Sequence, residues 1–289
     1  MPKDKKALVL GGKTGLLGQK LSQVLQERGW EVKAPFRGEV DIFSEEAVSS
    51  YVQEHSISHI FNTVAYTQVD LAEEEKEQAR LLNRNLPKIL AQVASKKNLY
   101  FIHYSTDFVF NGKHTLPYEP EDKPHPLSVY GQTKLEGERA ITDILKQNFL
   151  IIRTAWLFGE DKENFVSKIL RLARERESLK VVHDQIGSPT YTKDLAIYTL
   201  NLLEKQGTGI FHLVNSGQAS WCELAQEAIS CAGLPCKVIP ITSKEYPQRA
   251  LRPSFSVLST RKFTQLTDIT PRPWIQALRE YLFSFHLED

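Results

Sequence analysis

The first apolar run of the chain reads Ala7-Leu8-Val9-Leu10-Gly11-Gly12-Lys13-Thr14-Gly15-Leu16-Leu17-Gly18. Residues 7–10 are typical of a short buried strand, and apolar side chains recur at helical spacing over 16–28. The glycines at 12, 15 and 18 allow a tight turn, close approach of a pyrophosphate and close packing of helix on strand. The helix N-terminus offers N–H groups and partial positive charge to phosphates. This segment predicts a dinucleotide-binding loop. The alternative is a plain structural turn.

Beyond this loop, strand and helix patterns alternate through the first half of the chain. We expect strands at 7–10, 30–36, 59–63, 99–104 and 149–154, and helices at 16–28, 45–55, 73–97 and 127–147. Pro87 should kink or break the third helix. Alternation of this kind predicts an α/β fold with a doubly wound, parallel, Rossmann-like sheet.

The second half of the chain is less regular, and its prolines collect late. We expect helices at 164–176, 193–205 and 221–232, a strand at 210–214, and short elements afterwards. This predicts a Rossmann domain at 1–155, with roughly 181–207 packing back onto it. A smaller, partly interleaved substrate-binding domain would cover 156–289.

Composition excludes several classes of protein. Among 289 residues, Lys and Arg number 36 and Asp and Glu 35, so a net charge of +1 gives no reason to expect nucleic acid as a partner. No apolar run approaches the ~18 residues of a membrane helix. The three cysteines, Cys222, Cys231 and Cys236, form no CxxC pair, and the eight histidines show no metal-ligand spacing. We expect reduced thiols, a cytoplasmic location and no metal site readable from the sequence.

The tip of the second strand bears on cofactor choice. A carboxylate there would favour NAD, whereas Arg37 follows Phe36 and could accommodate a 2′-phosphate. Asp41 comes later, where it could contact adenine. The pattern favours NADPH, with NADH tolerated. Alternatively, Arg37 is a solvated loop charge.

Tyr130 and Lys134 lie four residues apart on a predicted helix and share one face. Reduction of a ketone requires a hydride, a proton for the alkoxide and a donor that holds the carbonyl oxygen. An adjacent ammonium favours the phenolate, so Lys134 should lower the pKa of the Tyr130 phenol. A hydroxyl from Thr106 or Ser105, at the end of the fourth strand, would orient the carbonyl. The alternative is a half-buried tyrosine with a snorkelling lysine.

With these motifs in place, the chain resembles the extended short-chain dehydrogenase/reductase family over nearly its whole length. The resemblance rests on seven segments, at 12–18, 62–70, 103–110, 129–138, 153–156, 184–190 and 252–258. It implies an oxidoreductase of carbohydrate biosynthesis that reduces the C4 ketone of a nucleotide-linked deoxysugar with NAD(P)H.

The resemblance, together with the glycine loop and the tip of the second strand, assigns roles to individual positions. The cofactor would be bound by Gly12, Lys13, Thr14, Gly15, Leu16, Leu17, Gly18, Arg37, Asp41, Ile42, Val64, Ala65, Tyr66, Tyr104, Tyr130 and Lys134. The catalytic residues would be Tyr130, Lys134 and Thr106, and the substrate would contact Thr106, Asp107, Trp156 and Arg252. Three of these have plainer alternatives: Trp156 as a core aromatic, Asp107 as a loop cap and Arg252 as a surface charge.

Two departures from the family pattern leave the sugar open. Phe108 stands where the family usually has tyrosine, and Thr63 where it usually has alanine. The alternatives are a reductase or epimerase of another nucleotide sugar, and a non-catalytic regulatory subunit of the methionine adenosyltransferase type. The resemblance alone suggests Mg²⁺, and a homodimer is left open.

Overall fold

Six parallel strands form the central sheet of the computed structural model, which describes the backbone of residues 5–285 and the side chains of residues 5–283. The strands are β1 (Lys6–Leu10), β2 (Glu31–Lys33), β3 (His59–Asn62), β4 (Tyr100–Thr106), β5 (Phe149–Thr154) and β10 (Gly209–His212). Their order is β2-β1-β3-β4-β5-β10, and every pairing is parallel. The chain therefore reverses its direction of winding between β1 and β3, where ligands bind in open α/β sheets.

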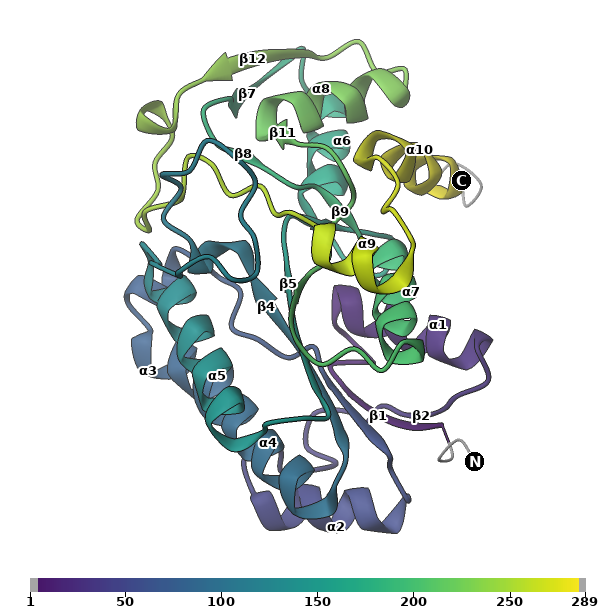
Figure 1. Cartoon of the computed structure of the whole chain (residues 1–289). Helices are drawn as coiled ribbons and strands as arrows, with labels where there is room; N and C mark the ends of the chain where they lie inside the picture. The colour runs from purple at the N-terminus through teal and green to yellow at the C-terminus, as the bar shows by residue number, and fades with distance from the viewer. Residues whose placement is uncertain (1–4, 286–289) are drawn as a thin grey trace.

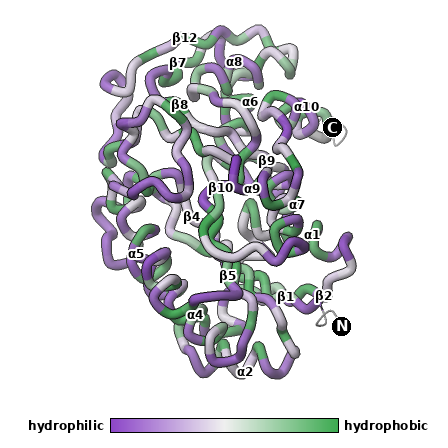
Figure 2. The backbone as a smooth tube through the Cα atoms, viewed as in Figure 1, coloured by the Kyte–Doolittle hydropathy of each residue, from purple (hydrophilic) through white to green (hydrophobic). Residues whose placement is uncertain are grey.

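Helices cover both faces of this sheet, because its strands are apolar on both sides. In β1, Ala7 and Val9 pack against α1 (Leu16–Glu27) and α7 (Thr192–Glu204), whereas Leu8 and Leu10 face the opposite layer. That opposite layer consists of α2 (Glu45–Glu54), α4 (Leu86–Lys97) and α5 (Val129–Ile144). Figure 1 shows the two layers on either side of the sheet, and Figure 2 shows the apolar stretches that run along its strands.

A second group of elements lies beyond the carboxyl ends of the sheet strands (Figure 1). Its helices are α6 (Phe165–Glu175), α8 (Trp221–Cys231) and α10 (Trp274–Phe285). Its strands form three pairs: β7 (Ser178–Val182) with β12 (Lys237–Ile241), β6 (Leu157–Phe158) with β9 (Thr190–Tyr191), and β8 (Ile186–Gly187) with β11 (Ala219–Ser220). The helix α9 (Arg261–Thr267) returns to the sheet, where Phe263 joins the core beside α7.

Most expected elements are present, with three differences. The second strand ends at Lys33 instead of residue 36, since Pro35 has no N–H to donate to a ladder. The expected helix at 73–97 is broken into η1 (Leu71–Glu73), α3 (Lys76–Arg80), a π-helical turn η2 (Leu81–Asn85) and α4, whose first turn contains Pro87. The 12-residue helix α10 was expected only as a short element, and Pro273 stands directly before it.

Elements late in the sequence are divided between the central sheet and the second group, so the two parts do not correspond to two continuous halves of the chain. β7 pairs with β12 in the second group, whereas α7 packs on α1 and β10 pairs with β5. The remaining short helices, η3 (Asp107–Val109) and η4 (Ser243–Glu245), belong to loops. Within the described part of the chain, no helix has the length and apolar character needed to cross a membrane.

Candidate active site

The glycine loop opens at the carboxyl end of β1. Gly11 has a φ of +85°, and a Cβ on Gly18 would lie 2.2 Å from the Gly11 carbonyl oxygen, so only glycine allows α1 to approach β1 this closely. The N-cap residue of α1, Gly15, provides no side-chain cap. The helix start therefore presents backbone N–H groups of the kind that bind phosphate, which fits a dinucleotide.

Thr63 supports this loop from the neighbouring strand. Its hydroxyl donates to the carbonyl oxygen of Leu10 at 2.7 Å, and a Cβ on Gly11 would lie 2.5 Å from the same hydroxyl. Its departure from the family pattern thus places a hydroxyl beneath the glycine loop, where it closes the end of β1.

The expected adenosine side of the site is open. The Lys13 ammonium lies 5.2 Å from the centre of the exposed Phe36 ring, and Arg37 beside it is exposed. Asp41 is also exposed, and its carboxylate accepts a hydrogen bond from the Phe43 N–H at 3.0 Å. Ile42 and Val64 pack on the edge of the core formed by α2 and α4.

The segment after β3 is fixed by a residue that the sequence analysis did not identify. Asn83, fully buried in η2, accepts from the Tyr66 N–H at 2.9 Å and donates to the Tyr66 carbonyl oxygen at 3.2 Å. It also donates to the Thr133 hydroxyl on α5 at 3.1 Å. Pro87 next to a helix break was the only sequence signal for this π-helical turn, a feature frequent at functional sites.

Tyr130 lies at the start of α5, beside the end of β4. Its phenol is within hydrogen-bonding reach of Thr106, and the Phe108 ring meets its ring edge-on at a centroid distance of 5.8 Å. The Ser128 side chain caps the helix by accepting from the Gly131 N–H. A Cβ on Gly131 would lie 2.2 Å from the Phe108 carbonyl oxygen, so the absence of a side chain lets α5 pack directly on η3.

The electrostatics of Tyr130 differ from the expectation. Burial raises the pKa of its phenol to about 12, and the nearby Asp107 charge acts in the same direction. The hydrogen bond with Thr106 lowers the pKa and only partly offsets these effects. The expected lowering by Lys134 is not seen. The Lys134 amine nitrogen lies 2.6 Å from the Tyr104 carbonyl oxygen and 3.3 Å from His103 Nε2.

Two hydroxyls were candidates to orient a carbonyl, and the structure separates them. Ser105 points to the face of β4 opposite that of Thr106, and its hydroxyl donates to Glu138 at 2.5 Å. Glu138 is held there by Arg153, with Nε–Oε1 and Nη2–Oε2 distances of 3.0 and 2.7 Å. Only Thr106 shares the site with Tyr130.

Tyr104 occupies the face of β4 that packs on α7. Its side chain is buried, and its hydroxyl lies 3.0 Å from the Thr199 hydroxyl. Burial raises the pKa of this phenol strongly. The side chain is therefore part of the core, and the carbonyl oxygen is what Tyr104 contributes beside Lys134.

Asp107 is buried under the loop that contains Ser256. One carboxylate oxygen accepts from the Ser256 hydroxyl at 2.6 Å, and the other accepts from the Thr106 hydroxyl at 3.1 Å. Burial raises the pKa of the carboxyl to about 6, against the lowering effect of these bonds. Ser256, from the expected 252–258 motif, is thus a further residue of the site, and the sequence analysis gave it no role.

Trp156 has both faces of its ring covered. Trp221 stacks on one face with the ring centroids 3.5 Å apart, and a Cβ on Gly187 would lie 2.5 Å from the ring. Its φ of +46° is strained for an aromatic residue. A ligand at this place could therefore meet an edge of the ring.

Arg252 is held by a carboxylate from the sheet side of the molecule. Its Nη2 and Nη1 atoms donate to the two Asp70 oxygens at 2.7 and 3.1 Å. Asp70 also accepts from the backbone N–H groups of Arg249 and Ala250, both at 3.0 Å. The hydrogen bonds with Arg252 are the main reason that the pKa of Asp70 is lowered.

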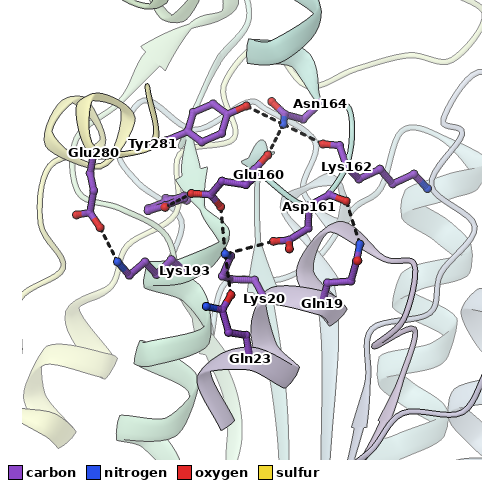
Figure 3. A network of polar contacts seen from close by, with 12 residues as sticks. Gln19, Lys20, Gln23, Glu160, Asp161, Lys162, Asn164, Lys193, Glu280 and Tyr281 are labelled. Carbon is purple, nitrogen blue, oxygen red and sulfur yellow. Dashed lines mark hydrogen bonds and ion pairs between the residues drawn. The ribbon is translucent and has the colours of Figure 1, made fainter. Parts of the chain in front are cut away.

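Like the Asp70–Arg252 pair, a group of polar contacts joins distant segments, here α1 and the segment after β6 (Figure 3). The Lys20 ammonium lies 3.4 Å from Glu160 Oε2 and 3.5 Å from Asp161 Oδ2. Gln19 donates to the Asp161 carbonyl oxygen at 2.9 Å. Burial raises the pKa of Asp161, and the Lys20 charge opposes this. Among the residues with described side chains, no cluster of three or more His, Cys, Asp or Glu could hold a metal ion.

The site as a whole brings together residues far apart in the sequence. Thr106, Asp107, Tyr130 and Lys134 lie around the end of β4, and Ser256 reaches them from the late loop. Trp156 and Arg252 belong to the second group, where Trp221 stacks on the first and Asp70, from the sheet side, binds the second. Arg37 and Asp41 remain apart on the open side of the glycine loop.

Comparison with known proteins places this site in a family context. The model of the family described as RmlD substrate binding domain matches residues 6–286. The spore coat polysaccharide biosynthesis protein SpsK of Bacillus subtilis is 39% identical over 277 residues, which cover 96% of each chain. A dTDP-4-dehydrorhamnose reductase of Clostridium acetobutylicum superposes with a TM-score of 0.92 at 37% identity, covering 97% of this chain and 99% of that one. The reductase of the same name from Bacillus anthracis, in complex with NADP, gives a TM-score of 0.93 at 30% identity with the same coverage.

Proposed function

The chain belongs to the RmlD substrate binding domain family, and from this membership we propose that it is an NADPH-dependent oxidoreductase that reduces the C4 ketone of dTDP-4-dehydro-L-rhamnose to dTDP-L-rhamnose. The observation that carries the proposal is the position of Tyr130 and Thr106, side by side at the end of β4, with Lys134 one turn further along α5. Such a group can bind a carbonyl oxygen and protonate it.

The glycine loop and its surroundings would hold the cofactor. The backbone of Lys13, Thr14 and Gly15 would meet the pyrophosphate, while Val64, Ala65 and Tyr66 would line the nicotinamide side. Bound NADPH supplies the hydride that reduces C4. Lys134, close to Tyr130 on α5, would hydrogen-bond the nicotinamide ribose.

Tyr130 would donate its phenolic proton to the oxygen at C4. The raised pKa of about 12 in the cofactor-free chain keeps this proton in place before the reaction. Thr106 would hold the carbonyl oxygen beside the phenol, because its hydroxyl already lies there. As negative charge develops on that oxygen, transfer of the proton becomes favourable.

The remaining candidates would bind the nucleotide sugar. Asp107, supported by Ser256, would contact the sugar hydroxyls, and Trp156 would meet the sugar with a ring edge. Arg252, held by Asp70, would present its guanidinium to the diphosphate. The sheet domain, 1–155, would therefore carry the cofactor, and 156–289 most of the substrate contacts, with α7 and β10 added to the sheet.

We propose that the protein prefers NADPH to NADH. The exposed Arg37, four residues beyond the end of β2, and the NADP bound to the B. anthracis reductase support this preference. Arg37→Ala should weaken NADPH binding about tenfold while leaving NADH nearly unchanged, because only NADPH carries a 2′-phosphate. Equal losses for both cofactors in a fluorescence titration would contradict the assignment. We also propose a cytoplasmic location, which the three free thiols support.

A second candidate is reduction of a different nucleotide-linked keto sugar. Phe108 favours it, because its ring lies against Tyr130 and carries no hydroxyl for the sugar. The two candidates share the reaction and differ in the substrate.

The deciding experiment is NADPH consumption on addition of dTDP-4-dehydro-L-rhamnose, with the product identified by mass and NMR. Formation of dTDP-L-rhamnose is expected. Tight NADPH binding without turnover of this sugar would contradict its assignment as the substrate. A panel of other nucleotide-linked keto sugars would then test the second candidate.

A further inference from the structure

A chain of buried polar groups connects the loop after β3 to the amine of Lys134. Val64 N–H donates to Asn62 Oδ1 at 3.2 Å, and Asn62 Nδ2 lies 3.1 Å from His103 Nδ1. His103 Nε2 lies 3.3 Å from Lys134 Nζ. The side chains of Asn62 and His103 are fully buried and that of Lys134 nearly so, so solvent cannot replace any member of this chain.

The direction of every bond in this chain follows from its first donor. A backbone N–H can only donate, so the Asn62 oxygen faces Val64 and the Asn62 amide nitrogen faces His103. That nitrogen can only donate, so Nδ1 of His103 must accept. The proton of the neutral imidazole then sits on Nε2 and points at Lys134.

An ammonium group has three donors and no lone pair, so it cannot accept this hydrogen bond. A neutral amine can accept from His103 Nε2–H while it donates to the Tyr104 carbonyl oxygen at 2.6 Å. We propose that Asn62 and His103 are positioning residues that direct the Nε2–H of His103 at Lys134 and so favour its neutral amine in the cofactor-free protein. The contacts alone carry this assignment, and its meaning for turnover rests on the proposed function.

The charges around Lys134 do not force it to be protonated. Glu138 follows it by one turn on α5, but this carboxylate is paired with Arg153 on β5 and accepts from Ser105 on β4. His103 lies next to the Lys134 amine, and Tyr130 precedes Lys134 by one turn on the same helix.

The direction of the pKa shifts agrees with this arrangement. Burial lowers the pKa of Lys134 to about 8, with Glu138 acting against it. Burial holds the pKa of His103 well below its usual value, and a positive charge on Lys134 lowers it further, so the imidazole stays neutral whether or not Lys134 is protonated. A lysine of this kind can take up and release a proton close to neutral pH, which an ordinary lysine cannot do.

The first test is the tautomer of His103 in the cofactor-free, full-length protein. We expect ¹⁵N NMR of histidine-labelled protein to show the Nε2–H tautomer, unchanged between pH 6 and 8, with the resonances assigned by their loss in His103→Gln. An Nδ1–H tautomer or an imidazolium would overturn the proposal. This measurement does not depend on turnover, so it separates the proposal from the proposed function.

The second test reverses the direction of these hydrogen bonds with one isosteric substitution. In Asn62→Asp a carboxylate still accepts from Val64 N–H, but it can only accept from His103, so the imidazole proton moves to Nδ1 and Nε2 becomes an acceptor for an ammonium. The ¹³Cε titration of Lys134 should then shift upward by about one pH unit or more, and the alkaline limb of the kcat/KM profile should follow.

The matched control is Asn83→Asp, which adds the same buried charge on η2 without touching His103. It should leave the tautomer unchanged. An unchanged tautomer in Asn62→Asp, or the same tautomer change in both variants, would contradict the proposal. If Asn62→Asp does not fold, the wild-type tautomer still decides.

Discussion

Asp107 shows how burial sets the chemistry of a single side chain. Its pKa of about 6 lies above the usual value of 3.8, so the folded chain keeps this proton over a range where the unfolded chain has lost it. The stabilising contribution of the group is fully present below pH 3.8 and is lost as the pH rises through 6.

The free energy of unfolding should carry this signature. Relative to Asp107→Asn, the wild-type protein should lose about 3 kcal/mol in all as the pH rises from well below 3.8 to well above 6, which is 1.36 kcal/mol for each pKa unit. Urea unfolding of both proteins across this range measures it, with the exposed Asp143→Asn as control. A difference between wild type and Asp107→Asn that stays constant with pH would show that the buried carboxyl titrates normally.

Tyr130 carries the proton in the proposed reaction, so its hydroxyl should matter mainly in the transition state. Tyr130→Phe should lower kcat by about 10²–10⁴-fold with little change in the Kd for NADPH. Steady-state kinetics and a fluorescence titration check the two values, with Tyr51→Phe on α2 as control. Turnover within a factor of two of wild type would remove Tyr130 from the mechanism.

Among the elements, η2 and α5 are joined by a contact that tolerates no side chain. A Cβ on Gly137 would lie 2.1 Å from the Asn83 carbonyl oxygen, although the helix itself would accept alanine. The π-helical turn and α5 therefore meet through backbone, and this contact holds Asn83 where it binds both Tyr66 and Thr133.

Gly137→Ala should consequently destabilise the protein in spite of its better helix propensity. We expect a loss of about 1–3 kcal/mol in the free energy of unfolding, the usual range for overpacking. Urea unfolding tests this, with Asp143→Ala on the exposed side of α5 as the matched control. A more stable Gly137→Ala protein would mean that η2 moves away at little cost.

At the scale of the whole molecule, several polar contacts tie the sheet to the second group of elements, and two of them join segments that flank the site. Asp70 binds Arg252 and the backbone around it, and Lys20 binds Glu160 and Asp161 (Figure 3). Both partners of Asp70 and Lys20 lie more than 130 residues away in the sequence. These contacts fix how the loops at 160–161 and 249–252 sit relative to α1 and the segment after β3.

Asp70→Asn should weaken substrate binding, because an amide nitrogen facing the guanidinium would release Arg252 from its ordered position. We expect KM for the nucleotide sugar to rise about 3–10-fold, equivalent to about 1 kcal/mol, with a smaller change in kcat. The control is Glu74→Gln, which removes the exposed ion pair with Arg249 in the same loop. A lower KM in Asp70→Asn would show that Asp70 competes with the diphosphate instead of presenting the arginine.

The fold could be predicted from the sequence because it depends on local periodicity. Alternating apolar runs specify strands that are buried on both faces, and glycines at fixed spacing specify the turn into α1. The same local patterns place Tyr130 and Lys134 on one helical face, and Thr106 at the end of β4. These inferences need only the period of a helix or strand and the direction of a parallel sheet.

The state of those side chains was decided by tertiary structure, because burial and hydrogen-bond direction depend on neighbours distant in sequence. Ser105 and Thr106 lie on opposite faces of β4. The Ser105 hydroxyl is bound to Glu138, which Arg153 holds in place, whereas Thr106 lies beside Tyr130. Asn62 and His103, 41 residues apart, meet Lys134 only in the folded sheet. The sequence by itself determined the parallel sheet, the glycine loop and the placing of Thr106, Tyr130 and Lys134 at the end of β4. Packing determined which other residues join them, which side chains are held by partners and where their protons lie.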